Sequence, residues 1–348
     1  MRFHAHFFSK TAPGILGAFL LSLAGCEKKD QTGDWAALAQ PPGADVPAKP
    51  VSAPKPAPTA ENSGTTASTI PAVEAGTIRF VVFNVENWLT MERYVAGKAQ
   101  PGRPKPEKER LAVASVLAGA QPDILGVSEI GTEEDVRDLQ THLEKAGHPM
   151  PHFHLNRGAD PVRNLVLLSR FPIARSVAHD GLTYRSKGKE YGMQRGILDA
   201  SIETPSGAYR FLGVHLKSKR ETQDGDQEGM RLGEAHLLRM KLDGILHEDP
   251  AARLVVYGDF NDTRNSPAVR TVRGSGNGRA TLQMISLKDS QGESWTHFWD
   301  YQDTYTRIDY VMVSDALRKS VKWDDCRIID GPEVSRASDH RPLLVILK

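Results

Sequence analysis

Short apolar runs alternate along most of the chain with longer segments whose apolar residues recur at helical spacing. β-Branched and aromatic residues dominate the short runs, which we predict to be strands: 78–85, 124–127, 165–168, 197–202, 209–215, 254–257, 307–313 and 342–347. The turn Thr-Pro-Ser-Gly at 204–207 should join two of them as a hairpin. Helical spacing predicts helices over 107–120, 133–146 and 228–246. This order of elements indicates a mixed α+β domain.

The first residues follow a different pattern. A positively charged start precedes an uncharged, largely apolar stretch at 11–25, which has the form of an export signal and is too short to span a membrane. The sequence Leu-Ala-Gly-Cys at 23–26 resembles the bacterial lipoprotein cleavage box, which implies that Cys26 becomes the lipidated first residue. An ordinary signal peptide with a chance cysteine is the alternative. Because residue 27 is Glu and not Asp, we expect anchoring in the outer rather than the inner membrane of a bacterial cell envelope.

Residues 26–76 are dominated by Pro, Ala, Thr and Ser. Such a segment has too few large apolar side chains to offset the entropy lost on ordering, so we expect a disordered, semi-extended tether. The sequence therefore predicts a signal peptide at 1–25, a tether at 26–76 and one large domain at 77–348.

Composition excludes a strongly basic nucleic-acid-binding protein, since 44 Lys and Arg stand against 43 Asp and Glu. The charge is uneven, however, because residues 185–220 hold eight Lys or Arg and three Asp or Glu. This basic segment surrounds His215 and favours a phosphate-bearing substrate, although a solvated basic surface is the alternative. The sequence has two cysteines, Cys26 and Cys326. If Cys26 carries lipid, the fold holds without an intrachain disulfide, and we interpret Cys326 as structural.

Polar residues follow several of the predicted strands. Asp259 and Asn261 belong to Gly-Asp-Phe-Asn at 258–261, where we expect Gly258 to allow a tight turn. Their alternate spacing places both side chains on one face of an extended segment. Asn84 and Glu129 end two other apolar runs. The sequence has no HExxH, CxxC array or GxxxxGK[ST] motif, which disfavours zinc and nucleoside triphosphates, whereas hard oxygen ligands suit Mg²⁺ or Mn²⁺.

These motifs, together with His215, Arg-Ile-Asp-Tyr at 307–310 and Ser-Asp-His at 338–340, occur in the order found in the endonuclease/exonuclease/phosphatase superfamily, which they resemble. That superfamily comprises metal-dependent phosphoesterases and includes pancreatic-type deoxyribonuclease. The resemblance covers most of residues 77–348. It implies an enzyme with a four-layer α/β/β/α sandwich of two packed mixed sheets.

The resemblance also implies roles for individual residues. Glu129, Asn84 and Asp339 would hold the metal. Asp259 would lie beside the attacking water, and Asn261 would bind the scissile phosphate. His340 would act as base or phosphate partner, and Asp309 would orient it. The second histidine, His215, would protonate the leaving oxygen or stabilise its charge.

Further residues are candidates for substrate binding. Lys217 and Ser218 follow His215 and could contact phosphates. Arg195 precedes the His215 hairpin, where the superfamily often carries a phosphate-binding arginine; an ordinary surface ion pair is the alternative. A tyrosine-containing motif typical of the abasic-site repair branch is absent near His215, so the chain departs from that branch.

The sequence therefore predicts a divalent-metal-dependent phosphodiesterase of the cell envelope, most simply an endonuclease that hydrolyses DNA or RNA. A phosphoesterase that acts on lipids or small molecules, similar to sphingomyelinase or an inositol-phosphate phosphoesterase, is the alternative. Five aromatic residues between 291 and 306 could stack on bases or touch lipid, although core packing is their commoner use: Trp295, Phe298, Trp299, Tyr301 and Tyr305. We expect a monomer whose partners are nucleic acid as substrate and, through Cys26, the membrane.

Overall fold

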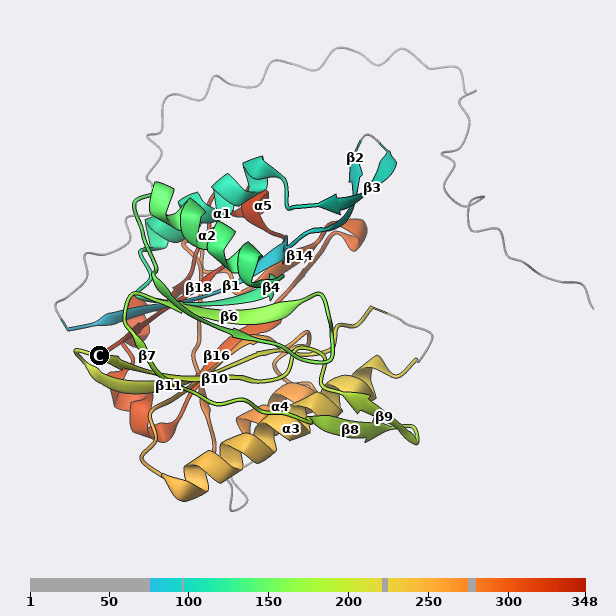
Figure 1. The fold of residues 1–348 in the computed structure, drawn as a ribbon. Helices are drawn as coiled ribbons and strands as arrows, with labels where there is room; N and C mark the ends of the chain where they lie inside the picture. The colour runs from blue at the N-terminus through green and yellow to red at the C-terminus, as the bar shows by residue number, and fades with distance from the viewer. Residues whose placement is uncertain (1–75, 96, 221–224, 275–279) are drawn as a thin grey trace, which may run out of the picture. The chain divides into compact units, whose positions relative to one another are not determined.

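The computed structural model describes residues 76–348, except residue 96 and the segments 221–224 and 275–279 (Figure 1). The predicted signal peptide, Cys26 and almost all of the predicted tether lie outside the described residues. No helix within the described residues is long and apolar enough to cross a membrane.

One six-stranded sheet has the order β17–β18–β1–β4–β6–β5. It is mixed, because β1 pairs parallel with β4 and antiparallel with β18, and β4 pairs antiparallel with β6. Its central strands are apolar and buried, as expected for a sheet covered on both faces. The strand bounds are β1 Ile78–Trp88, β4 Ile124–Ile130, β5 His152–Asn156, β6 Asn164–Ser169, β17 Arg327–Ile328 and β18 Leu343–Leu347.

The second six-stranded sheet has the order β13–β16–β12–β11–β10–β7. The predicted hairpin forms between β10 and β11, β11 pairs parallel with β12, and β12 pairs antiparallel with β16. The strand bounds are β7 Ile173–Ser176, β10 Leu198–Thr204, β11 Gly207–His215, β12 Leu254–Asp259, β13 Gln283–Met284 and β16 Asp309–Val313.

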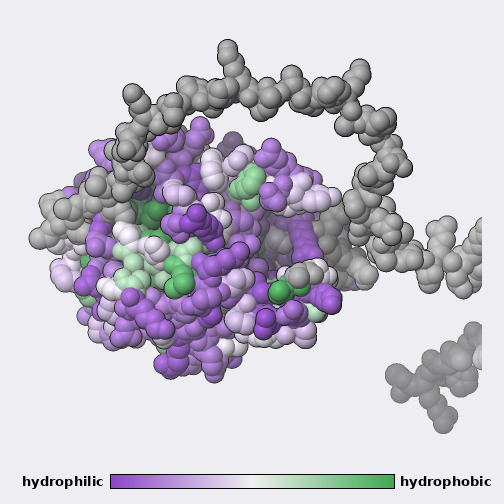
Figure 2. Space-filling view, turned by 90° about the horizontal axis from the view of Figure 1, so that it is seen from above, coloured by the Kyte–Doolittle hydropathy of each residue, from purple (hydrophilic) through white to green (hydrophobic). Residues whose placement is uncertain are grey.

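The sheets pack against each other and helices cover their outer faces (Figure 1). Between the sheets, the ring of Phe80 lies 4.9 Å from that of Phe211 and 5.0 Å from that of Tyr257. The first sheet is covered by α1 Glu107–Ala120, α2 Glu133–Lys145 and α5 Val334–Ala337, and the second by α3 Gln227–Glu248 and α4 Pro267–Arg273. From the side of α1 and α2, the surface is mainly hydrophilic with small apolar patches (Figure 2). This four-layer arrangement confirms the predicted α/β/β/α sandwich.

Three two-stranded hairpins lie outside the two large sheets. They are β2 Met91–Val95 with β3 Lys98–Arg103, β8 Thr183–Ser186 with β9 Lys189–Gly192, and β14 His297–Trp299 with β15 Thr304–Thr306. Short 3-10 helices are η2 Asp300–Gln302, η3 Asp315–Ser320 and η4 Trp323–Asp325. The sequence pattern did not predict these hairpins, because their apolar runs are short and their side chains are mostly exposed.

Gly258 corrects the expectation of a tight turn at this position. It lies inside β12, where it pairs with Val214 of β11 and Tyr310 of β16, and the strand continues through Asp259. Its φ is 132°, and a Cβ atom would lie 1.9 Å from the Val214 carbonyl oxygen. The glycine is therefore required for the close approach of β12 to β11, which sets the position of Asp259 at the strand end.

Cys326 is free and buried, which agrees with its interpretation as a structural residue. Burial raises the pKa of its thiol to about 11, so the thiol stays protonated at neutral pH.

A buried ion-pair network stabilises the second sheet. Asp199 is fully buried, and its carboxylate accepts bonds of 2.8 and 2.7 Å from Arg210 and lies 2.8 Å from His179 Nε2. Burial acts to raise the pKa of Asp199, but the bonds from Arg210 and His179 outweigh it and hold the pKa below its ordinary value. A depressed carboxylate pKa stabilises the fold above the unfolded-state pKa, and this contribution is lost as the pH falls through the folded-state pKa.

We therefore expect Asp199→Asn to lower the free energy of unfolding by about 3 kcal/mol at pH 7, since Arg210 loses its charged partner. The deficit should shrink below about pH 4, where the wild-type carboxylate also becomes protonated. Urea unfolding of both proteins at pH 7 and pH 3 measures this. If the variant were less stable than the wild type by the same free energy at both pH values, the charge of Asp199 would not be the source of the stabilisation.

Candidate active site where the two sheets meet

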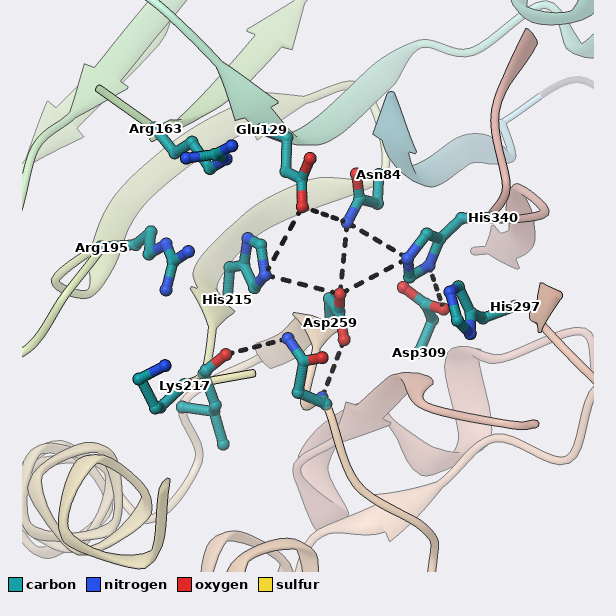
Figure 3. A network of polar contacts seen from close by, with 12 residues as sticks. Asn84, Glu129, Arg163, Arg195, His215, Lys217, Asp259, His297, Asp309 and His340 are labelled. Carbon is teal, nitrogen blue, oxygen red and sulfur yellow. Dashed lines mark hydrogen bonds and ion pairs between the residues drawn. The ribbon is translucent and has the colours of Figure 1, made fainter. Parts of the chain in front are cut away.

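Five of the predicted residues lie at the ends of neighbouring strands. His215 ends β11, Asp259 ends β12 and Asp309 begins β16. The strand register pairs Asp259 with both of the others, so the three residues lie in a row. From the other sheet, β1 contributes Asn84 and β4 contributes Glu129. The parallel pairing of β1 with β4 and of β11 with β12 brings these side chains to one edge of the sandwich (Figure 3).

Asn84 lies at the centre of this group. Its amide nitrogen is 3.2 Å from Asp259 Oδ2, 3.3 Å from Glu129 Oε1 and 3.4 Å from His340 Nε2 (Figure 3). Ser338 fixes its backbone, because Ser338 Oγ donates to the Asn84 carbonyl at 2.8 Å and accepts from the His340 N–H at 3.0 Å. Asn84 thus joins the two sheets with residues far apart in the sequence.

His340 is held by Asp309, as predicted. His340 Nδ1 lies 2.9 Å from Asp309 Oδ2, and Thr296 Oγ1 donates to the same carboxylate oxygen at 2.7 Å. Burial acts to lower the pKa of His340, but Asp309, Asp259 and Asp339 outweigh it and raise the pKa well above its ordinary value. The ring is therefore charged at neutral pH, with Nε2 directed toward Asn84 and Asp259.

His215 differs from His340 in charge. It is buried, and its Nε2 lies 3.6 Å from Asp259 Oδ2 and 3.9 Å from Glu129 Oε1. Burial, followed by the charge of Arg195, lowers the pKa of His215 well below its ordinary value. A neutral ring can donate one N–H, so its chemistry fits stabilisation of a charged oxygen better than transfer of a proton.

Asp259 is buried among other acids. Burial and then Asp309 raise its pKa to about 7. One of its oxygens accepts the Asn261 N–H at 2.8 Å, and the Asn261 amide donates to the Leu216 carbonyl at 3.0 Å. Asn261 is therefore fixed beside Asp259 and against Leu216, the residue that follows His215.

Backbone strain gathers at this site. Glu86, Asn87, Glu129 and Asn261 have positive φ values of 48°, 60°, 63° and 51°, in the left-handed region that non-glycine residues rarely adopt. Within the described residues, these are four of the seven non-glycine residues with positive φ. Such conformations cluster where function requires them, and here they direct Glu129 and Asn261 into the site.

Asp339 lies at the outer side of His340. Its carboxylate is 4.0 Å from His340 Nε2 and 3.7 Å from His297 Nε2, and its side chain is 42% exposed. The ring of His297 lies 4.6 Å from that of His340. Asp339 therefore faces the site from the side opposite His215.

The predicted substrate-binding residues lie on the His215 side. Arg195 and Lys217 point toward His215 (Figure 3), and Arg195 Nη2 is 3.6 Å from Asp160 Oδ2. Arg195 is thus buried beside an acid and is no ordinary surface ion pair. Ser218 is half-buried in the segment that follows Lys217, and within the described residues its side chain contacts none of the catalytic candidates.

Sequence reasoning missed Thr296, His297, Ser338 and Arg163 as members of the site. Thr296 and Ser338 position other residues through hydroxyl bonds, and no sequence pattern marks Thr296. His297 and Arg163 reach the site only because an unpredicted hairpin and a loop fold next to it. Ser338 could have been found, because it belongs to the quoted Ser-Asp-His motif.

The donor chemistry fits a hard divalent cation. Glu129, Asp259 and Asp339 supply carboxylate oxygens, the ligands that Mg²⁺ and Mn²⁺ prefer. Carboxylates gathered in a buried place raise the pKa of Asp259, and a bound cation would relieve this repulsion. Glu129 and Asp339 would hold it. Asn84 does not fit its predicted role as a ligand, because its amide nitrogen faces Glu129 and Asp259 while its oxygen accepts the Glu86 N–H at 3.0 Å.

Glu234, in α3, shapes the site from behind. It is fully buried, and its oxygens accept the Gln194 N–H at 2.9 Å and the Lys217 N–H at 2.7 Å. We expect Glu234→Ala to lower the free energy of unfolding by about 3 kcal/mol, because two buried backbone donors lose their acceptor. Glu228→Ala, in the same helix at an exposed position, is the matched control. Equal unfolding midpoints for both variants in urea would contradict this role.

Comparison with known proteins identifies the family of this chain. Residues 96–340 match the model of the endonuclease/exonuclease/phosphatase family. No curated protein matches the chain.

Solved structures resemble the fold at low sequence identity. An endonuclease/exonuclease/phosphatase from Bacteroides vulgatus has 19% identity, a TM-score of 0.54 and coverage of 78% of this chain and 98% of its own. A family protein from Leptotrichia buccalis has 16% identity, a TM-score of 0.53 and coverage of 78% and 99%. Sphingomyelinase C from Streptomyces griseocarneus has 12% identity, a TM-score of 0.50 and coverage of 78% and 99%. The family match over most of the domain, together with the shared fold, shows that this chain belongs to the endonuclease/exonuclease/phosphatase family.

Proposed function

We propose that the protein is a divalent-metal-dependent phosphodiesterase whose substrate is DNA or RNA. The observation that carries this proposal is the contact network of Asn84, Asp259, His340 and Asp309, in which a charged histidine, an acid and an amide face one point. Hydrolysis of a diester needs donors for the phosphate oxygens, an acceptor for the proton of water and stabilisation of the leaving oxygen. This site holds a residue for each task.

The residues divide the reaction as follows. Asp259, with its pKa near neutral, accepts the proton of the attacking water. His340, charged and oriented by Asp309, donates Nε2–H to a phosphate oxygen, and Asn261 binds the same phosphate. His215 donates to the leaving oxygen as the bond to phosphorus breaks. A bound Mg²⁺ or Mn²⁺ would supply charge neutralisation and polarise the phosphate oxygens.

Positive charge on the His215 side of the site supports a nucleic-acid substrate. Arg195 and Lys217 lie beside His215, and the segment 185–220 that contains them is basic. A polynucleotide carries a phosphate at every residue, so cations flanking the scissile group add affinity for it.

The β14–β15 hairpin supports a second candidate, hydrolysis of a lipid phosphoester. Trp299, Tyr301 and Tyr305 are 48%, 85% and 55% exposed, so core packing, their commoner use, does not explain them. Exposed aromatics suit an apolar ligand, and one of the similar structures is a sphingomyelinase. The same rings also suit stacking on bases.

A substrate panel separates these candidates. Plasmid DNA, single-stranded RNA, sphingomyelin and inositol phosphates are incubated with the purified protein in Mg²⁺, Mn²⁺ or EDTA. We expect metal-dependent nicking of plasmid. Hydrolysis of lipid with intact DNA and RNA would reject the nuclease and support the second candidate.

We also propose that Cys26 is lipidated and anchors the protein in the cell envelope, on the outer membrane. The sequence Leu-Ala-Gly-Cys at 23–26 supports this. Fractionation of cells that express the wild type and Cys26→Ser tests it. We expect the wild type in the outer-membrane fraction, and the variant's presence there in equal amount would reject lipid anchoring.

A further inference from the structure

Three cationic side chains gather on the His215 side of the site, away from His340 and Asp309: Arg163, Arg195 and Lys217 (Figure 3). They come from separate parts of the chain. Arg163 precedes β6, Arg195 precedes β10 and Lys217 follows β11. The fold thus concentrates positive charge where the leaving group of the reaction would lie.

The backbone of this cluster is fixed before any ligand binds. Asp160 Oδ1 accepts the Arg163 N–H at 3.2 Å, and its other oxygen lies 3.6 Å from Arg195 Nη2. The Arg195 carbonyl accepts a bond of 2.9 Å from the Asn156 amide. Glu234 holds Lys217 through its N–H at 2.7 Å. Asp160 and Glu234 therefore act as positioning residues for the three cations.

The charged groups of Lys217 and Arg163 keep donors free for a ligand, and buried Arg195 has one donor without a partner. Arg195 is 8% exposed, and its buried Nε has no hydrogen-bond partner. Within the described residues, the ammonium of Lys217 makes no hydrogen bond or ion pair. Arg163 uses Nε to bind Asn87 Oδ1 at 2.8 Å and leaves its terminal nitrogens unbonded among the described residues. A buried arginine donor without a partner is costly, and a bound anion would supply a partner.

We propose that Arg163, Arg195 and Lys217 form a subsite for a second phosphate group of the substrate, adjacent to the scissile diester on its leaving-group side. This deepens the proposed function and rests on it. The three cations outnumber the two carboxyl groups that contact the cluster, Asp160 and Glu234, and such a surplus of positive charge suits a phosphate dianion or diester. A substrate with phosphates one sugar apart would occupy both positions, whereas an isolated diester would fill only the scissile position.

Binding of small nucleotides tests the subsite without any turnover. Calorimetric titration in Mg²⁺ compares thymidine 3′,5′-bisphosphate with thymidine 3′- and 5′-monophosphate. We expect the bisphosphate to bind the wild type at least about tenfold more tightly than either monophosphate, the effect of one further charge-assisted contact. Inositol 1,4-bisphosphate against inositol 1-phosphate forms a second arm. A larger preference in that arm would keep the subsite and assign it to an inositol phosphate.

Two variants attribute the preference to the cluster. Lys217→Met keeps the backbone bond to Glu234, and Arg163→Gln keeps a donor for Asn87. We expect the bisphosphate preference to fall below about threefold in each, because one cationic contact is lost. Lys319→Met is the matched control, since Lys319 is exposed and η3 follows β16 at the end remote from Asp309.

Equal affinity of the wild type for bisphosphate and monophosphate would overturn the subsite. An unchanged preference for bisphosphate over monophosphate in both Lys217→Met and Arg163→Gln would also overturn the subsite. If the proposed function is wrong, the wild type will not hydrolyse bis(p-nitrophenyl) phosphate. The binding titrations do not depend on that hydrolysis, so the two failures can be distinguished.

Discussion

We expect replacement of His340 by glutamine to lower kcat for the proposed phosphodiester hydrolysis by at least about 10³-fold, the upper part of the range for loss of a positioned acid–base group. The ring is charged because Asp309 and Asp259 outweigh its burial and raise its pKa. Glutamine retains a donor of similar length but no charge, and it cannot keep the Nδ1 contact of 2.9 Å with Asp309. The measurement is the rate of release of p-nitrophenol from bis(p-nitrophenyl) phosphate in Mg²⁺.

The control for this variant is His148→Gln, the same chemical change outside the site. His148 Nε2 contacts the Pro122 carbonyl at 2.7 Å. We expect His148→Gln to retain the wild-type rate and His340→Gln to retain a wild-type melting profile. A His340→Gln protein that is folded and fully active would show that the histidine does not take part in the reaction.

Replacement of Glu129 by glutamine raises the Mg²⁺ concentration needed for half-maximal activity by at least about 100-fold, because a charged oxygen ligand becomes a neutral one. Glu129 is directed at Asn84 by a strained backbone with φ of 63°, and it accepts the Asn87 N–H at 3.1 Å. Glutamine can occupy the same volume, so the change tests charge with little effect on packing. Titration of activity with Mg²⁺ and direct calorimetry with Mn²⁺ both report it.

Glu203→Gln is the matched control for Glu129, since Glu203 is an exposed acid on β10. We expect its Mg²⁺ dependence to equal that of the wild type. If Glu129→Gln shows unchanged metal dependence in both measurements, the metal is held elsewhere and the assigned ligand set is wrong.

Much of the fold could be predicted from hydrophobic periodicity. The helix predicted at 107–120 has those bounds, and the hairpin of β10 and β11 forms at the Thr-Pro-Ser-Gly turn. Periodicity succeeded in these places because each element buries one continuous apolar face. It was misleading in α3, where Met240 is 68% exposed while Arg231, Glu234 and Arg239 are buried. Ion pairs and backbone contacts decide burial there, and these depend on the tertiary structure.

The site could be predicted in part. Short motifs revealed Asn84, Glu129, His215, Asp259, Asp309 and His340, and the strand register then brings them together. The motifs held no information on Arg163 or Asp160, because loops bring these residues to the site and no local pattern marks them. Core packing, the commoner of the uses predicted for the aromatics at 291–306, does not explain Trp299, Tyr301 and Tyr305, which are exposed.

The most direct test of the central claim is hydrolysis of bis(p-nitrophenyl) phosphate by the wild type in Mg²⁺ and in EDTA, beside Asp259→Asn in Mg²⁺. Among the residues that the structure describes, Asp259 alone contacts Asn84, His215 and His340, at 3.2, 3.6 and 3.7 Å. We expect hydrolysis by the wild type that EDTA abolishes, and a loss of at least about 10³-fold in the variant. Hydrolysis that persists in EDTA, or that a folded Asp259→Asn protein retains, would contradict a metal-dependent reaction at this site.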